Sequence, residues 1–324
     1  MSTTKKLSEL TDFFYEELHP DLKKLEEDRK SLAKKLTFVG IGIGILALII
    51  TYLLFTSFTS YSEMNFAPLF IGGAMFMWAK KSMSKSYSHE FKDNIIEPLI
   101  KQINERLSYS KTLCIAQRYF QASKIFTEGI DRYHGNDLVK GELEGVKIRF
   151  SDVHAEYKTR DSKGRTSWHT IFQGLFLVAD FNKDFKGETL ILPDKAEKSF
   201  GKFIGSWLQS KNMNRNELVK MDSPQFEKHF VVYATDQIEA RYILTHSMMK
   251  RLLDYKKRVQ VPLHISFVNQ QIFLALAYNK DLFEPTIFST LLKFELIKEY
   301  ISTLQLAIGI IDELKLNEKL WSKA

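Results

Sequence analysis

The stretch Leu36-Thr-Phe-Val-Gly-Ile-Gly-Ile-Gly-Ile-Leu-Ala-Leu-Ile-Ile-Thr-Tyr-Leu-Leu-Phe-Thr-Ser-Phe58 decides how this chain is organised. No charged side chain occurs from Leu36 to Ser62. A helix rises about 1.5 Å per residue, so roughly 20 residues cross a hydrocarbon core about 30 Å thick. We therefore predict a membrane-spanning helix at about 36–58. A cleaved signal peptide is excluded, because eight acidic and eight basic residues precede the stretch.

A second uncharged stretch follows at Met64–Ala79, after the single charge of Glu63. As a helix it reaches only about 24 Å, which is short for a complete crossing. We predict a second, short span at 64–79, because a long charged region follows it; a re-entrant segment is the alternative. Residues 36–79 thus form a predicted two-helix transmembrane hairpin.

Basic residues flank this hairpin but are absent from its turn, Thr56–Asn65. They are Arg29, Lys30, Lys34 and Lys35 before it, and Lys80, Lys81 and Lys85 after it. The positive-inside rule places both ends of the chain in the cytoplasm and the turn outside. The prediction is an integral inner (plasma) membrane protein with two spans.

Small residues in the hairpin predict close helix packing. Gly40 and Gly44 have the G-x-x-x-G spacing that lets two helix backbones approach. Packing of these glycines within the hairpin, against Gly72 and Gly73, is the favoured interpretation. Dimerisation of two chains through the same face, or neither role, stays open.

Apolar residues at helical spacing predict helices on both sides of the hairpin. Within residues 1–35 we predict two amphipathic helices, separated near His19-Pro20. Arg29 interrupts their apolar stripe. With balanced charge, this segment is expected to dock on the domain or pair as a coiled coil. Residues 80–125 are predicted to form a helical stalk and linker. Its helix, Ser86–Tyr109, must kink or restart at Pro98.

Residues 126–324 are predicted to form one cytoplasmic α+β domain with a mainly antiparallel sheet. A continuous apolar run, Gly174–Ala179, is typical of a strand covered on both faces. Helices are expected after Asp236, after Thr245 and over Phe200–Leu208, and a long carboxyl-terminal helix from Pro285 to about Leu314. The remaining predicted strands are 137–141, 145–150, 152–159, 167–181, 189–192, 230–233, 263–267 and 271–277.

Composition excludes several classes of site. The chain has 324 residues, a net charge of +7 and one cysteine, Cys114, which rules out a disulfide framework, a cysteine-rich zinc module and an iron–sulfur cluster. No phosphate-binding glycine loop, nucleophile elbow or H-E-x-x-H helix is present. We therefore expect no catalytic residue, no cofactor and no nucleotide site.

Several short motifs resemble a family of bacterial membrane-anchored proteins, domain-of-unknown-function family 3137, over roughly Phe126–Trp321. They are Asp137-Leu-Val-Lys-Gly141, Phe150-Ser-Asp-Val-His-Ala-Glu156, Phe172-Gln-Gly-Leu-Phe176, Leu192-Pro-Asp194, Phe230-Val-Val-Tyr233, Glu239-Ala-Arg-Tyr-Ile-Leu-Thr245 and Leu282-Phe-Glu-Pro285. The resemblance implies an amino-terminal membrane hairpin and a cytoplasmic α+β domain. It implies no established activity and no catalytic residue.

Alternating polar residues suggest one candidate metal site. Asp152, His154 and Glu156 project from one face if 152–159 is a strand. His169 joins that face if the turn 160–165 pairs Lys158 with His169, and a slip of one residue moves it away. The favoured interpretation is a solvated or partner-facing surface, with no metal.

A basic surface is the other candidate. Arg160, Lys163 and Arg165 lie in one predicted turn beside Trp168, and Lys80 and Lys81 follow the hairpin. These five cations are candidate contacts for anionic lipid headgroups, with ordinary solvation as the alternative. Nucleic-acid binding is not expected, because no aromatic-rich RNA-binding strand accompanies them.

The sequence therefore predicts a non-catalytic module tethered to the inner membrane, acting as a scaffold, an adaptor or a membrane-surface binding protein. Its expected partners are the lipid bilayer and another membrane or cytoplasmic protein; homo-oligomerisation stays open. The alternative is a membrane-bound metal-dependent enzyme using Asp152, His154, Glu156 and His169. Transport is disfavoured, because two spans without an intramembrane charge pair line no pore.

Overall fold

A computed structural model describes residues 13–57, 63–181, 184–193, 217–314 and 316. The chain divides into two compact units. The helical unit comprises Ser8–Pro98 and Glu284–Lys298, and the sheet unit contains Leu99–Phe283 and the chain from Glu299 onward. We describe each unit by itself.

The helical unit is built around one uninterrupted helix. A π-helical segment, η1 (Phe14–Leu18), leads directly into α2 (His19–Ser57). The predicted break near His19-Pro20 is therefore only a change from π- to α-helix, because proline is tolerated in a first helical turn. The predicted amphipathic piece and the predicted span form a single helix.

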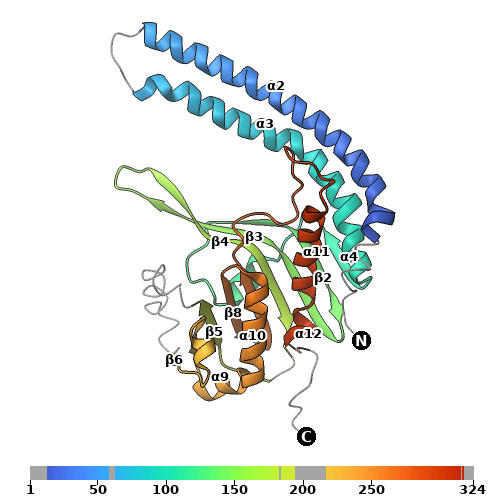
Figure 1. Ribbon diagram of the computed structural model, residues 1–324. Helices are drawn as coiled ribbons and strands as arrows, with labels where there is room; N and C mark the ends of the chain where they lie inside the picture. The colour runs from blue at the N-terminus through green and yellow to red at the C-terminus, as the bar shows by residue number, and fades with distance from the viewer. Residues whose placement is uncertain (1–12, 58–62, 182–183, 194–216, 315, 317–324) are drawn as a thin grey trace. The chain divides into compact units, whose positions relative to one another are not determined.

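A second helix, α3 (Ala67–Phe91), follows the 3-10 turn η2 (Glu63–Phe66) and lies beside α2 (Figure 1). It continues well past Ala79, so the apolar segment and the beginning of the predicted stalk are one helix. A π-helical turn, η3 (Lys92–Ile96), and then α4 (Glu97–Ile103) come next. The Glu97 amide bonds the carbonyl of Lys92, five residues back, just before Pro98, which has no amide hydrogen to donate.

The stalk helix was predicted to reach Tyr109, and this is wrong. Helix α4 ends at Ile103, and Leu107–Ser110 is a strand, β1, at the edge of the sheet. Asn104 ends the helical path, because its carbonyl accepts the amide of Leu107 and its side chain accepts that of Arg106. Asparagine favours such local turns over continued helix.

Within the described residues, the sheet unit contains a nine-stranded sheet in the order β1-β2-β3-β4-β9-β8-β5-β7-β6, with every neighbouring pair antiparallel. The strands after β1 are β2 (Arg132–Leu143), β3 (Val146–Arg160), β4 (Thr166–Asp180), β5 (Thr189–Pro193), β6 (Glu217–Val219), β7 (Phe230–Ala234), β8 (Leu263–Val268) and β9 (Gln271–Leu276). The predicted α+β class and antiparallel sheet are confirmed.

Both faces of the central strands are covered. Every residue from Leu175 to Ala179 is buried, as the apolar run predicted. On one face, Phe120 and Ile125 join sheet residues such as Phe176 and Phe273 in one apolar cluster. Side chains alternate along a strand, so Ile272, Leu274 and Leu276 of β9 point to the other face, where they are also buried.

Two helices of the sheet unit begin at the predicted positions, each with a side-chain cap. Asp236 accepts the amides of Ile238 and Glu239 at the start of α9 (Gln237–Ile243), and Thr245 caps α10 (His246–Val259). Glu239 does not close a capping box; its carboxylate binds the amides of Lys186 and Gly187. Among the described residues, this unit also has two short helices, α5 (Gln117–Ala122) and α8 (Pro224–Glu227).

The long helix predicted from Pro285 is wrong. The chain has two short helices there, α11 (Phe294–Ile308) and α12 (Ile310–Leu314), separated at Gly309. Residues 284–293 are not helical, because the carbonyls of Thr286 and Ile287 accept side-chain bonds from Tyr87 and Arg29. The helix predicted at Phe200–Leu208 lies outside the described residues.

Candidate functional site

The apolar half of α2 presents large side chains outward. Phe38, Ile45 and Leu48 are 64%, 54% and 60% exposed. Among the described residues, the helix Glu16–Ser57 is the one long and apolar enough to cross a bilayer. Exposed apolar surface of this extent is unfavourable in water and is expected where lipid is the solvent.

The four predicted packing glycines divide into two pairs. A Cβ on Gly72 would lie 3.2 Å from the Ala47 side chain, and one on Gly40 would lie 2.9 Å from the Phe76 ring. These two glycines therefore let α2 and α3 approach each other. Gly44 and Gly73 have nothing within 4 Å of such an atom and lie outside this contact.

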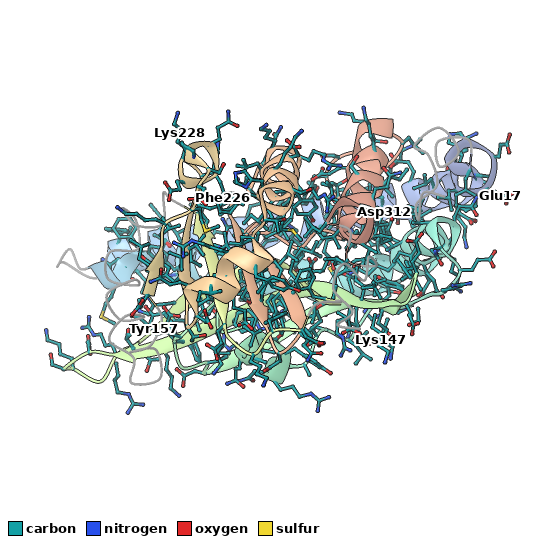
Figure 2. All side chains as sticks on the ribbon, turned by 90° about the horizontal axis from the view of Figure 1, so that it is seen from below. Glu17, Lys147, Tyr157, Phe226, Lys228 and Asp312 are labelled. Atoms are coloured by element: carbon teal, nitrogen blue, oxygen red, sulfur yellow. The ribbon has the colours of Figure 1, made fainter. Side chains whose placement is uncertain are left out.

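Strands β3 and β4 continue past the sheet as a two-stranded ribbon, residues 157–170 (Figure 1). Beyond Tyr157 its side chains project outward on both sides (Figure 2). At its turn, the Asp161 carboxylate accepts the amides of Lys163 and Arg165, so the one acidic residue of the ribbon stabilises the turn. Lys158 pairs with Asp131.

Three predicted headgroup contacts lie at the tip of this ribbon. Arg160, Lys163 and Arg165 are exposed and make no ion pair within the described parts of the chain. The other two predicted contacts lie in α3, in the other unit. There, Lys80 lies 5.8 Å from the centroid of the Phe288 ring, and Lys81 is exposed.

The structure brings together two of the four predicted metal candidates, together with a residue that sequence analysis missed. His154 Nε2 lies 3.9 Å from Glu156 Oε1 on β3. His134 of β2 is paired directly with His154, and the two ring centroids are 4.8 Å apart. Burial and the neighbouring His154 lower the pKa of His134, which favours the neutral imidazole.

The other two candidates lie elsewhere. His169 pairs with Tyr157 rather than Lys158, because β4 has a bulge opposite Ala155 and Glu156. The His169 ring therefore stacks on Tyr157, and its Nε2 lies 2.8 Å from Thr159 Oγ1, on the face away from His154. Asp152 is buried and accepts the Leu282 amide at 2.7 Å.

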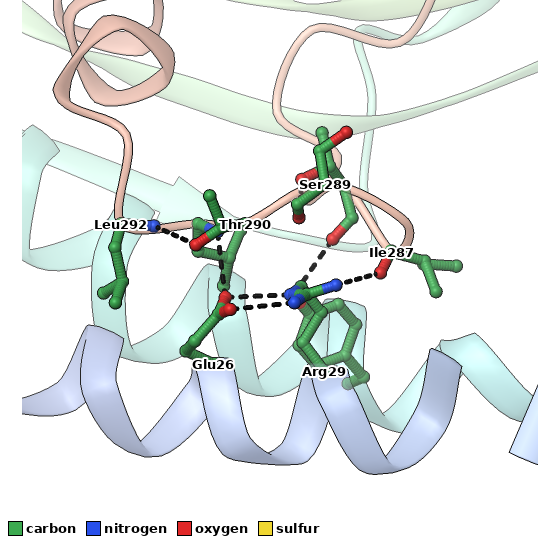
Figure 3. Close-up of polar contacts among 9 residues, drawn as sticks. Glu26, Arg29, Ile287, Ser289, Thr290 and Leu292 are labelled. Atoms are coloured by element: carbon green, nitrogen blue, oxygen red, sulfur yellow. Dashed lines mark hydrogen bonds and ion pairs between the residues drawn. The ribbon is translucent and has the colours of Figure 1, made fainter. Parts of the chain in front are cut away.

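A buried ion pair in the helical unit was also missed. Glu26 and Arg29, one turn apart on α2, are only 4% and 9% exposed. Arg29 donates to both Glu26 carboxylate oxygens at 2.8 Å and to the Ile287 carbonyl at 2.6 Å (Figure 3). Glu26 also accepts the Leu291 amide at 3.0 Å. From the sequence, Arg29 was a cation flanking the hairpin and an interruption of the apolar stripe, and its pairing with Glu26 was not predicted.

The single cysteine, Cys114, lies in the sheet unit. The thiol is half-buried, and burial raises its pKa, which disfavours the reactive thiolate.

These features define an α+β protein with an antiparallel sheet and an amino-terminal helix apolar enough to anchor it in a membrane. Residues 170–316 match the family described as "Protein of unknown function (DUF3137)". The match confirms the resemblance on a shorter range than predicted, since the motifs at 137–141 and 150–156 precede it.

The solved structure titled "crystal structure of the mycobacterial trehalose monomycolate transport factor A, TtfA" is similar to this chain at 10% sequence identity and a TM-score of 0.30. The similarity covers 62% of this chain and 86% of that one. No curated protein matches the chain.

Proposed function

We propose that this protein is a non-catalytic module anchored in the inner membrane, whose ribbon binds anionic lipid headgroups on the cytoplasmic side. The main support for a membrane anchor is the exposed apolar surface of α2. A water-soluble helix hides such side chains in a core, whereas Ile45 and Leu48 are more than half exposed.

We extend the anchor to two spans, with α3 as the second. Phe70, Met77 and Trp78 of α3 are between 72% and 78% exposed, as lipid-facing residues are expected to be. The contact of α3 with α2 at Gly72 supports a paired insertion. Lys80 and Lys81 at the end of this apolar segment favour a cytoplasmic position for both termini.

If α2 spans the membrane, a charge in its apolar part should impair membrane insertion. Ile45→Lys is expected to cost about 3 kcal/mol of insertion free energy, because a charge near the middle of a span loses its hydration. The measurement is the fraction of full-length protein that stays with membranes after an alkaline wash. Ile238→Lys is the control, because Ile238 is equally apolar and 81% exposed but lies in α9. A wild-type chain that purified without detergent would contradict the proposal.

The ribbon supplies the membrane-surface contact in this proposal. Its three unpaired cations, Arg160, Lys163 and Arg165, surround a turn whose only carboxylate already binds backbone amides. Near an anionic leaflet each is worth about 1 kcal/mol. Trp168, 41% exposed on the same ribbon, adds a side chain that favours the membrane interface.

The variant R160E/K163E/R165E tests this contact. In nanodiscs containing anionic phosphatidylglycerol, wild-type amides of 157–170 are expected to exchange more slowly than in phosphatidylcholine. The variant should lose this protection, worth about 3 kcal/mol in total, as should the wild type in about 1 M salt.

The matched control K147E/K228E/K250E makes the same change in net charge at exposed positions outside the ribbon. It should keep the protection of the ribbon amides. Protection that is the same in both lipids would mean that the ribbon binds something other than anionic headgroups.

The alternative, a metal-dependent enzyme using Asp152, His154, Glu156 and His169, has less support. Asp152 is buried and bonded to the Leu282 amide, and His169 lies on the face away from His154. Those four side chains do not converge on one position where a substrate could bind.

A further inference from the structure

At the base of the ribbon, one face of β2 and β3 carries a compact set of metal-ligating side chains. His134 and His154 are directly opposite each other, and Glu156 follows two residues along β3 on the same face. One donor atom from each of these three residues lies within 4.8 Å of the other two. The set therefore comes from two strands whose pairing fixes its spacing.

These three residues have the chemistry of a transition-metal site. Imidazole nitrogens and a carboxylate oxygen bind Zn²⁺ at about 2.0–2.2 Å, which places the donors about 3–3.5 Å apart. The donors lie within 4.8 Å of one another without a metal, and His134 is exposed, so neighbouring groups do not lock its ring in place. Exposure on one side leaves room for water as a further ligand.

Neighbouring groups already orient the carboxylate. Arg132 Nη1 donates to Glu156 Oε2 at 3.2 Å, which leaves Oε1 on the side of His154. The guanidinium of Arg132 lies 3.9 Å from the centroid of the Trp168 ring, so it is itself held in place. Partners of this kind fix ligand orientation in metal sites.

We propose that His134, His154 and Glu156 bind one divalent first-row transition-metal ion, with Zn²⁺ as the reference ion. The bound ion links β2 to β3 where the ribbon leaves the sheet. This site goes beyond the proposed function and does not depend on membrane binding by the ribbon.

Titration calorimetry of the full-length protein in detergent, after removal of metal with a chelator, tests the proposal with ZnCl₂ as the probe. The wild type should bind one equivalent. His134→Ala and His154→Ala should each weaken binding by at least about 100-fold, since even outer-shell changes in metal sites cost 10–100-fold. His169→Ala is the matched control, because it removes a nearby imidazole that lies on the face away from His154.

A second readout is independent of affinity. Zn²⁺ should slow amide exchange in β2 and β3 around the two histidines in the wild type and in His169→Ala, and not in His134→Ala. Because His134 is exposed, its variant is expected to fold, and the exchange pattern without metal verifies this. No saturable uptake by the wild type, or equal uptake by His134→Ala and His154→Ala, would overturn the site.

Discussion

Glu26→Gln is expected to destabilise the contact between α2 and residues 284–293 by about 3–5 kcal/mol, the range found when one partner of a buried ion pair is removed. The variant keeps the shape of the side chain but removes its charge. Arg29 then stays buried, at 9% exposure, with no carboxylate beside it. The Coulomb attraction that offset the loss of hydration is gone, while the desolvation cost of the guanidinium remains.

The effect should concentrate in residues 284–293, because the pair holds that segment by its backbone. Arg29 donates to the Ile287 carbonyl, and Glu26 accepts from the Leu291 amide. The side chain of Leu291 is fully buried. In this segment the backbone bonds side chains of α2 instead of forming its own helix, so the pair stabilises a non-helical path.

Amide hydrogen exchange of the full-length protein measures this effect at the residue concerned. The opening free energy of the Leu291 amide should fall in Glu26→Gln. Glu27→Gln is the matched control, because it makes the same charge change on the next, exposed residue of α2 and should stay within about 0.5 kcal/mol of wild type. In a double-mutant cycle with Arg29→Gln, the double variant should lose less than the sum of the single losses. Additive losses would show that the two side chains act separately.

The same pair predicts a pH dependence. The hydrogen bond from Arg29 lowers the pKa of Glu26 from an ordinary value of 4.5 to about 2. A lowered pKa means that the folded state favours the charged form, so the stabilisation is complete above about pH 4.5 and is lost as the pH falls toward 2. Exchange at Leu291 should show this acid destabilisation in the wild type. Glu26→Gln, which has no carboxyl group at this position, should lack it.

Local patterns predicted much of the sheet unit. Alternation and turn residues gave most of the strands, and the residue types at Asp236 and Thr245 gave two helix starts. These features depend on neighbours within a few residues, so local sequence patterns are enough to predict them. The apolar stretch from Leu36 likewise predicted the long helix, because its length alone exceeds what a soluble helix needs.

The errors occur where distant segments decide the outcome. The apolar residues after Pro285 fit a helix, yet residues 284–293 bind side chains of α2 and α3, more than 190 positions earlier in the chain. The four predicted metal candidates do not come together, for a related reason. A bulge in β4 turned His169 away, and His134 entered through the pairing of β2 with β3. Register between strands depends on such bulges, which no local pattern in this chain revealed.

Gly174→Ala is expected to destabilise the sheet unit by about 4 kcal/mol, at the upper end of single-substitution effects. Gly174 has φ of +149°, a conformation that residues with a side chain rarely adopt. A Cβ there would lie 2.1 Å from the Leu276 carbonyl oxygen and 2.8 Å from the Tyr278 amide nitrogen. Both contacts are with backbone, so no side-chain rotation can relieve them, and β4 must move away from β9 at the point where their pairing begins.

Gly164→Ala separates the two causes of this loss. Gly164 also has a positive φ, +79°, but a Cβ there meets nothing within 4 Å, so its substitution tests backbone strain alone, worth about 1 kcal/mol. The measurement is the opening free energy of the buried amides of Leu177 and Leu274, on the paired strands β4 and β9. If Gly174→Ala cost no more than Gly164→Ala, the close approach of β4 to the chain after β9 would not be what requires glycine at this position.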